Sequence, residues 1–124
     1  MLNLSRTLRV FVCTRPADMR RSFDGLCGMA ENLMKQNPLT GHLFVFRNRN
    51  RDRLKILYWD RDGLAIWYKR LEKGSFQLPT DLQSDGNDRA RAEISIDELT
   101  WLLGGVDLAS VKRRQRYSRS QKAG

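Results

Sequence analysis

The sequence has few of the side chains that hold metal ions. Its 124 residues include two cysteines, Cys13 and Cys27, and one histidine, His42. A structural zinc site needs four such ligands, so DNA-binding proteins of the zinc-finger type are excluded. A reducing cytosol favours two buried thiols over one disulfide, and we expect both cysteines to be buried as apolar side chains. The composition gives no reason to expect a cofactor.

Long apolar runs and nucleotide-binding motifs are missing as well. A membrane-spanning helix needs about 18 consecutive apolar residues, and no such run occurs. The first nine residues lack the apolar segment of a signal peptide, so we expect a cytoplasmic protein with no membrane partner. There is no Walker loop and no dinucleotide fingerprint. His42 opens a strand-like segment, which argues against Ser-His-Asp or Cys-His catalysis.

Carboxylates are present in numbers that would suffice for a metal-dependent nuclease, but their spacing follows no catalytic pattern. Helix caps, turns and surface ion pairs explain them more simply. We therefore expect a protein that is not an enzyme. A nuclease that uses Asp60 or Asp62 with Glu72 remains the least favoured alternative. The carboxylates weighed for this chemistry are Asp18, Asp24, Asp60, Asp62 and Glu72.

Several short segments have the composition of β-strands. Residues 8–13 (LRVFVC) are β-branched and aromatic, and residues 42–47, 53–59 and 64–71 follow in quick succession. Short connections make these three runs antiparallel neighbours. The pair Asp62-Gly63 predicts a tight turn in the second connection. A brief strand is expected at residues 93–96.

Two helices are predicted from apolar spacing and caps. Apolar residues at helical spacing from Met19 to Met34 predict a long helix, with Asp18 at its positive end. Gly25 and Gly28 interrupt it at a cost of about 1 kcal/mol each relative to alanine, which we attribute to a closely packed neighbour. A short helix is expected to begin with Asp97 as its N-cap and to end at residues 104–105.

These elements predict an α+β fold. We expect a small antiparallel β-meander packed against one long helix, with a short C-terminal helix, all within a single domain of residues 1–109. Residues 80–91 are rich in aspartate, glycine and asparagine and are expected to form a mobile loop. Residues 110–124 contain six basic residues and no acidic residue, and are expected to be a disordered tail.

The formal charge of +9 divides unevenly between the domain and the tail. Residues 1–109 hold 17 basic and all 14 acidic residues, a balance of +3, and the tail supplies the other +6. Six cations on a flexible arm with Tyr117 among them suit a phosphate backbone, although such a tail also serves as a solubilising extension. The basic residues of the tail are Lys112, Arg113, Arg114, Arg116, Arg119 and Lys122.

A second concentration of positive charge lies at the tip of the first predicted hairpin. Five basic residues and one acidic residue fall within nine positions, and an anionic partner would relieve their mutual repulsion. Arginine clamps phosphates and reads guanine edges, and a two-stranded ribbon fits the major groove. The alternative is a hairpin whose charges only prevent aggregation. These basic residues are Arg47, Arg49, Arg51, Arg53 and Lys55.

Aromatic side chains form a third and weaker candidate. They stand on adjacent strands together with two basic residues, and aromatics placed in this way stack on unpaired bases or pack in the core. The sequence does not fix the hairpin register, so it leaves open which of them share a face. The residues are Tyr58, Trp59, Trp67, Tyr68, Lys69 and Arg70.

Five ordered motifs resemble one known protein family. They are residues 18–26 (DMRRSFDGL), 38–46 (PLTGHLFVF), 57–63 (LYWDRDG), 69–76 (KRLEKGSF) and 99–107 (LTWLLGGVD). Together they look like the accessory protein of bacterial insertion sequences of the sixty-six family, the product of the second open reading frame, often called TnpB. This family is unrelated to the RNA-guided nuclease of the same name. The basic tail and residues 80–91 lie outside the motifs.

The resemblance implies a bacterial protein encoded beside a separate transposase and needed for efficient movement of the element. It offers no agreed catalytic residues. The leading hypothesis is a non-enzymatic factor that binds DNA, at the element's ends, through residues 47–55 and the tail, and assists the transposase. The alternative is a module that docks on the transposase itself. The oligomeric state stays open. Positions that match the motifs, in structural or functional roles, are Asp18, Arg20, Asp24, Gly25, Trp59, Asp60, Lys69, Arg70, Glu72 and Gly74.

Overall fold

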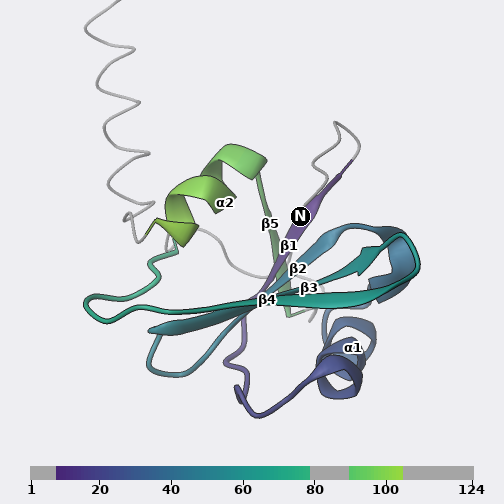
Figure 1. Ribbon diagram of the computed structural model, residues 1–124, viewed down its shortest axis with the longest axis horizontal. Coiled ribbons are helices and arrows are strands. Elements are labelled where there is room, and N and C mark those ends of the chain that lie inside the picture. Colours follow the sequence, from purple (N-terminus) through teal and green to yellow (C-terminus); the bar gives the residue numbers. More distant parts are fainter. Residues whose placement is uncertain (1–7, 79–89, 105–124) are drawn as a thin grey trace, which may run out of the picture.

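One five-stranded sheet organises the chain, in the strand order β4-β3-β2-β1-β5 (Figure 1). The computed structural model describes residues 8–78 and 90–104. Within these ranges neither helix is long and apolar enough to cross a membrane. The elements are β1 (Val10–Cys13), α1 (Phe23–Asn32), the 3-10 turn η1 (Pro38–Thr40), β2 (Leu43–Arg47), β3 (Arg53–Asp60), β4 (Gly63–Arg70), β5 (Arg91–Ile94) and α2 (Ile96–Leu103).

The sheet is covered on both faces, with α1 on one side and α2 on the other (Figure 1). Because side chains alternate along a strand, each strand feeds two separate cores. Phe11, Phe44 and Leu57 pack with Leu26 and Ala30 of α1. On the opposite face a second core forms under α2, from Val10, Val12, Val45, Ile56, Leu99 and Leu102.

The sheet is mixed, which corrects the expected antiparallel meander. β1 pairs with β2 in parallel, with Phe11 opposite Phe44, and pairs with β5 in the antiparallel direction. Strands buried on both faces are apolar throughout, and all four residues of β1 are buried. The α+β class is confirmed. The continuous apolar run of β1 marks a central strand, not the first strand of a meander.

The helix α1 is shorter than the periodicity predicts. It spans ten residues from Phe23 and not the expected stretch from Met19 to Met34. Residues 19–22 are not helical because their backbone is bonded to the sheet: the carbonyls of Met19 and Arg21 accept hydrogen bonds from the Lys55 ammonium of β3 at 2.8 Å each. Cys13 is buried, as expected, whereas Cys27, a residue of α1, is only half-buried, and both are free thiols.

The strands β2, β3 and β4 pair antiparallel in sequence order. The turn between β3 and β4 is displaced by one residue from the predicted Asp62-Gly63 pair. Asp60 pairs with Gly63, so Arg61 and Asp62 form the two-residue connection, and Arg61 adopts the left-handed φ of 60°. Gly63 is therefore a strand residue.

The start of α2 also differs from its prediction. Ser95, not Asp97, is the N-cap: its hydroxyl accepts a hydrogen bond from the Glu98 N–H, and the Glu98 carboxylate accepts one from the Ser95 N–H, each at 3.0 Å. This reciprocal capping box fixes the helix start. The preceding strand β5 begins at Arg91, within the segment expected to be a loop. The rest of that segment, except Ala90, and the predicted tail lie outside the described residues.

The two glycines of α1 have different surroundings. A Cβ on Gly25 would lie 3.0 Å from the Cβ of Arg21, so a close neighbour explains this glycine. A Cβ on Gly28 would meet nothing nearer than the Asn32 amide nitrogen at 3.9 Å. The expected close approach therefore holds at Gly25 and is wrong at Gly28.

We predict that Gly28→Ala raises the free energy of unfolding by about 0.5–1 kcal/mol, because alanine loses less backbone entropy in a helix and the site has room for its methyl group. Urea unfolding followed by circular dichroism measures the change. Gly25→Ala is the matched control and should give no gain, since its methyl group presses on Arg21. Equal stabilisation by the two substitutions would contradict this explanation.

Candidate nucleic-acid interface

The carboxyl ends of the parallel strands β1 and β2 lie side by side at one end of the sheet. Ligands commonly bind at this position in folds with parallel strands. The chain leaves β1 through residues 14–22 and leaves β2 through residues 48–52, and these two segments line a hollow of about 260 Å³. We call it the arginine hollow. It is lined by Cys13, Thr14, Arg15, Pro16, Arg47, Asn48, Arg49 and Arg51.

The arginine hollow is uniformly positive. Four of its eight lining residues are arginines and none is acidic. Within the part of the chain that the structure describes, none of the four forms an ion pair with a carboxylate. Burial raises the pKa of the Cys13 thiol, so the thiol adds no negative charge. The hollow thus combines guanidinium groups with the polar side chains of Thr14 and Asn48.

Arg47 is the most constrained of these arginines. Its side chain is half-buried, and one guanidinium nitrogen donates a 2.7 Å hydrogen bond to the carbonyl of Phe76. Burial lowers the pKa of Arg47, and the neighbouring charge of Arg51 lowers it further. A guanidinium stays protonated in proteins, so the lowered pKa marks a cation that lacks a compensating anion. An anion bound in the hollow would supply it.

The loop that carries Arg49 and Arg51 is held in place by its own hydrogen bonds. Asn48 accepts from the N–H of Arg53 at 3.0 Å and donates to the Asp52 carboxylate at 2.7 Å. The Arg51 carbonyl accepts from the Phe76 N–H at 2.6 Å, and Arg51 itself has a φ of 64°. Binding a ligand here does not require the loop to be ordered first, which lowers the entropic cost.

The five basic residues of the predicted hairpin do not all belong to this surface. Lys55 is only 8% exposed, and its ammonium donates to the carbonyls of Met19 and Arg21 at 2.8 Å each. It also lies 4.8 Å above the centre of the Tyr68 ring. Lys55 therefore attaches residues 14–22 to the sheet, and we leave it out of the proposed interface.

Arg53 lies apart from the hollow. It faces the α1 side of the sheet, where it donates to the Tyr68 hydroxyl at 3.4 Å. With Arg49 it borders a shallow depression of about 390 Å³ that Asp18 and Asp52 also line, so the charge there is mixed. The structure brings Arg47, Arg49 and Arg51 together, and places Arg53 beside them.

Arg15 belongs to the arginine hollow, but the sequence analysis did not single it out as a candidate. It is an isolated basic residue two positions after β1, and nothing in its neighbours singles it out. The signal that would have found it is the all-apolar β1, which predicts a central strand. A central strand joined to a parallel neighbour through a helix places its carboxyl end beside that neighbour's.

The predicted aromatic patch is divided between the two faces of the sheet. Register places Tyr58 and Trp67 on the α2 side, where they pack against the core, together with Lys69. The ammonium of Lys69 donates to the carbonyl of Leu103 at the end of α2, at 2.7 Å. Trp59, Tyr68 and Arg70 stand on the opposite face. The six residues therefore do not form one stacking surface.

The family-motif residues are spread over the molecule. Asp18 pairs with Arg20 at 2.7 Å in the loop before α1, and hydrogen bonds from Arg20 lower the pKa of Asp18 to about 2. Asp24 and Gly25 lie in the first turn of α1. Gly74 has a φ of 77° in the turn after β4, a conformation that favours glycine.

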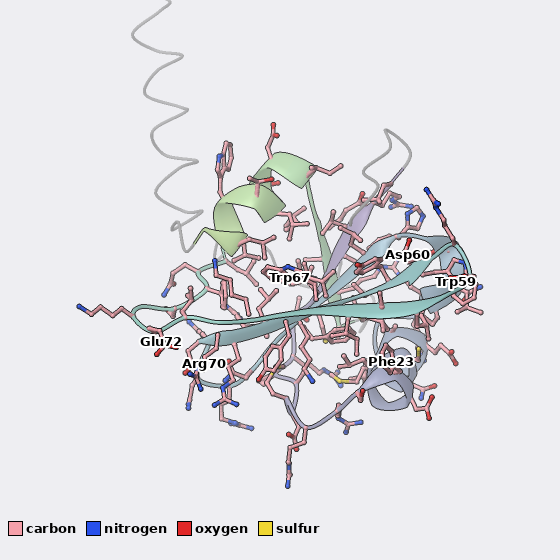
Figure 2. The ribbon with its side chains drawn as sticks, viewed as in Figure 1. Phe23, Trp59, Asp60, Trp67, Arg70 and Glu72 are labelled. Atoms are coloured by element: carbon pink, nitrogen blue, oxygen red, sulfur yellow. The ribbon has the colours of Figure 1, made fainter. Side chains whose placement is uncertain are left out.

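The carboxylates of the nuclease alternative are too far apart to share a metal ion. Asp60 and Asp62 precede β4, and Glu72 follows it and pairs with Arg70 at 3.1 Å. The eight residues of β4 span roughly 23 Å. Figure 2 shows Asp60 and Glu72 at opposite ends of the sheet. No group of three metal-binding side chains occurs in residues 8–78 and 90–104.

The fold is that of a small basic α+β protein with an arginine-lined hollow at the carboxyl ends of β1 and β2. Residues 8–113 match the model of the IS66 Orf2-like proteins, TnpB_IS66, so the chain belongs to this family of transposition accessory proteins. This confirms the resemblance seen in the sequence motifs. The family is not a known class of enzyme.

Two relatives from Sinorhizobium fredii (strain NBRC 101917 / NGR234) are similar over most of their length. The chain is 37% identical to y4jC over 114 residues, which cover 92% of each protein. It is also 37% identical to y4hO over 107 residues, which cover 86% of this chain and 88% of y4hO. Both relatives are named as uncharacterized proteins. No solved structure matches the chain.

His42 has a structural role at the start of β2. Its Nδ1 accepts a 3.0 Å hydrogen bond from the N–H of Arg9, and its ring meets the Phe11 ring edge-on with 5.8 Å between centres. Burial lowers the pKa of His42, and the charge of Arg9 lowers it further. An imidazole that accepts through Nδ1 must keep that nitrogen unprotonated.

We predict that His42 makes the protein less stable as the pH falls below about 6.5. Its pKa is lower in the folded state, so the unfolded chain binds more protons and stability rises with pH in this window. His42→Asn keeps an acceptor but does not titrate, and should remove the dependence between pH 7 and 5.5. Urea midpoints measure it. The pKa values of Asp18 and Glu93 are lowered, so they act below this window. An unchanged slope in the variant would contradict this role.

Proposed function

We propose that this protein is a non-enzymatic accessory factor for transposition that binds DNA, at the ends of its element, through the arginine hollow and assists the transposase. The family supplies the process. The observation that supports the DNA contact is Arg47, a half-buried cation beside Arg51 with no carboxylate partner among the described residues. Phosphate is the anion that DNA offers in greatest number.

The size of the hollow favours a phosphate group over a whole nucleotide. Cavities that enclose drug-sized ligands measure roughly 300–1,000 Å³, and the hollow, at about 260 Å³, falls below that range. Exposed Arg49 and Arg51 stand at the rim, where a guanidinium forms paired hydrogen bonds with phosphate oxygens. The backbone of a nucleic acid that crosses the hollow would thus place one phosphate over Arg47.

The basic tail is proposed to extend this contact. Its six positive charges raise the net charge from +3 for residues 1–109 to +9 for the whole chain, and such an arm follows a phosphate backbone without a fixed structure. Contacts of this kind raise affinity for all sequences equally. We assign sequence-independent affinity to the tail and positioning on the backbone to the hollow.

Replacing an arginine at the rim of the hollow should lower both the affinity for DNA and the steepness with which that affinity falls as salt increases. We expect Arg49→Gln and Arg51→Gln each to reduce the slope of log K against log salt by about one, and the double variant to bind about tenfold more weakly. Fluorescence anisotropy with labelled duplex at several salt concentrations measures both quantities. Arg61→Gln is the matched control, because it removes one exposed charge from the opposite end of the sheet. Equal losses in all variants would show a general charge effect and contradict a defined site.

Replacing the six basic residues of the tail by glutamine in the full chain should reduce the slope by several units and leave the effect of Arg49→Gln intact. Competition between terminal DNA and random DNA then measures specificity. An unchanged slope would remove the tail from the interface.

Docking on the transposase is the second candidate, favoured by the near-balanced charge of residues 1–109. Co-purification with the transposase in high salt after nuclease treatment distinguishes the two. A complex that persists supports direct docking, and one that is lost supports a bridge of DNA.

A further inference from the structure

The two edges of the sheet differ in a way that points to a partner strand. β5 is four residues long and carries the charged residues Arg91 and Glu93, as protected edges do. β4 is eight residues long, and its central residues, from Leu64 to Tyr68, include no charge. Its basic residues, Lys69 and Arg70, stand at one end. An exposed edge of this length and composition is a template on which another strand can pair.

The register identifies which backbone groups of β4 are available. The N–H of Leu71 donates to the carbonyl of Asp52, and that of Asn48 donates to the carbonyl of Arg53. Antiparallel pairs alternate between bonded and non-bonded, so the even-numbered residues of β4 direct their N–H and C=O groups away from β3. Within the described ranges no strand pairs with this side of β4.

We propose that a second copy of this chain pairs with β4 in the antiparallel direction, around a two-fold axis at Ile66. In this register Ile66 faces its own copy, and Leu64 faces Tyr68. On the α2 side of the sheet, the small Ala65 faces the large Trp67, and Gly63 leaves room for Lys69. The strand is therefore complementary to itself in size along its whole length.

Charge complementarity selects this register. Asp62, at the end of the turn before β4, lies opposite Arg70 of the second copy, and the symmetry forms this pair twice. Both side chains are exposed in the single chain, where Arg70 also forms its exposed ion pair with Glu72. A shift of the axis by one residue to Trp67 would instead set Asp62 against Glu72, two like charges, which destabilises a strand pair.

Exposed apolar surface on the same side supports the partner's position. Tyr68 is 47% exposed on the α1 side of the edge, and Phe23, at the start of α1, is 42% exposed. Figure 2 shows Phe23 beside α1, on that side of the sheet. Strand addition would cover Tyr68 with Leu64 of the second copy, and leave Arg70 paired with Asp62 at the rim.

Charge reversal tests the proposed register. Sedimentation equilibrium of the full chain should show a dimer. Asp62→Arg and Arg70→Asp each place like charges opposite one another at two symmetric sites, and each should weaken dimerisation about tenfold. The double variant restores opposite charges and should return to within about threefold of the natural chain. A monomer at 100 micromolar concentration, or a double variant no stronger than the single ones, would overturn the proposal. Circular dichroism confirms that each variant is folded.

A cysteine trap tests the axis itself. In a Cys27→Ser background, Ile66→Cys places two thiols at the two-fold, on a bonded pair whose Cα atoms lie about 5.5 Å apart, within the range for disulfides. Mild oxidation should give a covalent dimer. Ala65→Cys is the control, because it faces Trp67 of the second copy and not itself. Equal cross-linking of the two variants would overturn the axis at Ile66.

Discussion

The parallel pairing of β1 with β2 is the constraint on which the rest of the structure depends. Two parallel neighbours require a crossover, and α1 with its flanking loops supplies it. The crossover covers one face of the sheet, so the other face needs α2. The same pairing brings the loops after Cys13 and Arg47 together, and the arginine hollow follows from it directly.

A buried cation maintains this arrangement. Lys55 is almost fully buried, yet it has no carboxylate partner among the described residues and instead binds the carbonyls of Met19 and Arg21. Hydrogen bonds from a charged donor are about twice as strong as neutral ones, and they offset the loss of water. Lys55 therefore attaches the loop before α1 to β3. From its charge alone, the sequence analysis had predicted that it contacts DNA.

The sequence was sufficient to predict the α+β class and the link to transposition. It was not sufficient to predict the parallel strand pair or which basic side chains share a surface. The three antiparallel runs and the short C-terminal helix were visible in local patterns. The parallel pairing was not, because it depends on residues 33 positions apart, such as Val10 and Leu43. In the same way, charge counting grouped Arg47 with Lys55, whereas strand alternation places their side chains on opposite faces of the sheet, with different hydrogen-bond partners.

The two proposals constrain one another geometrically. β4 runs in the same direction as β2, since β3 is antiparallel to both, so the arginine hollow and the carboxyl end of β4 lie toward the same end of the sheet. A two-fold axis through β4 reverses the second copy, and the two hollows then face opposite ends of a continuous ten-stranded sheet. Two hollows that point apart cannot lie on one straight stretch of duplex. The dimer would therefore hold two separate segments of DNA, or one segment that bends around it, and either arrangement agrees with the proposed role at the two ends of an element.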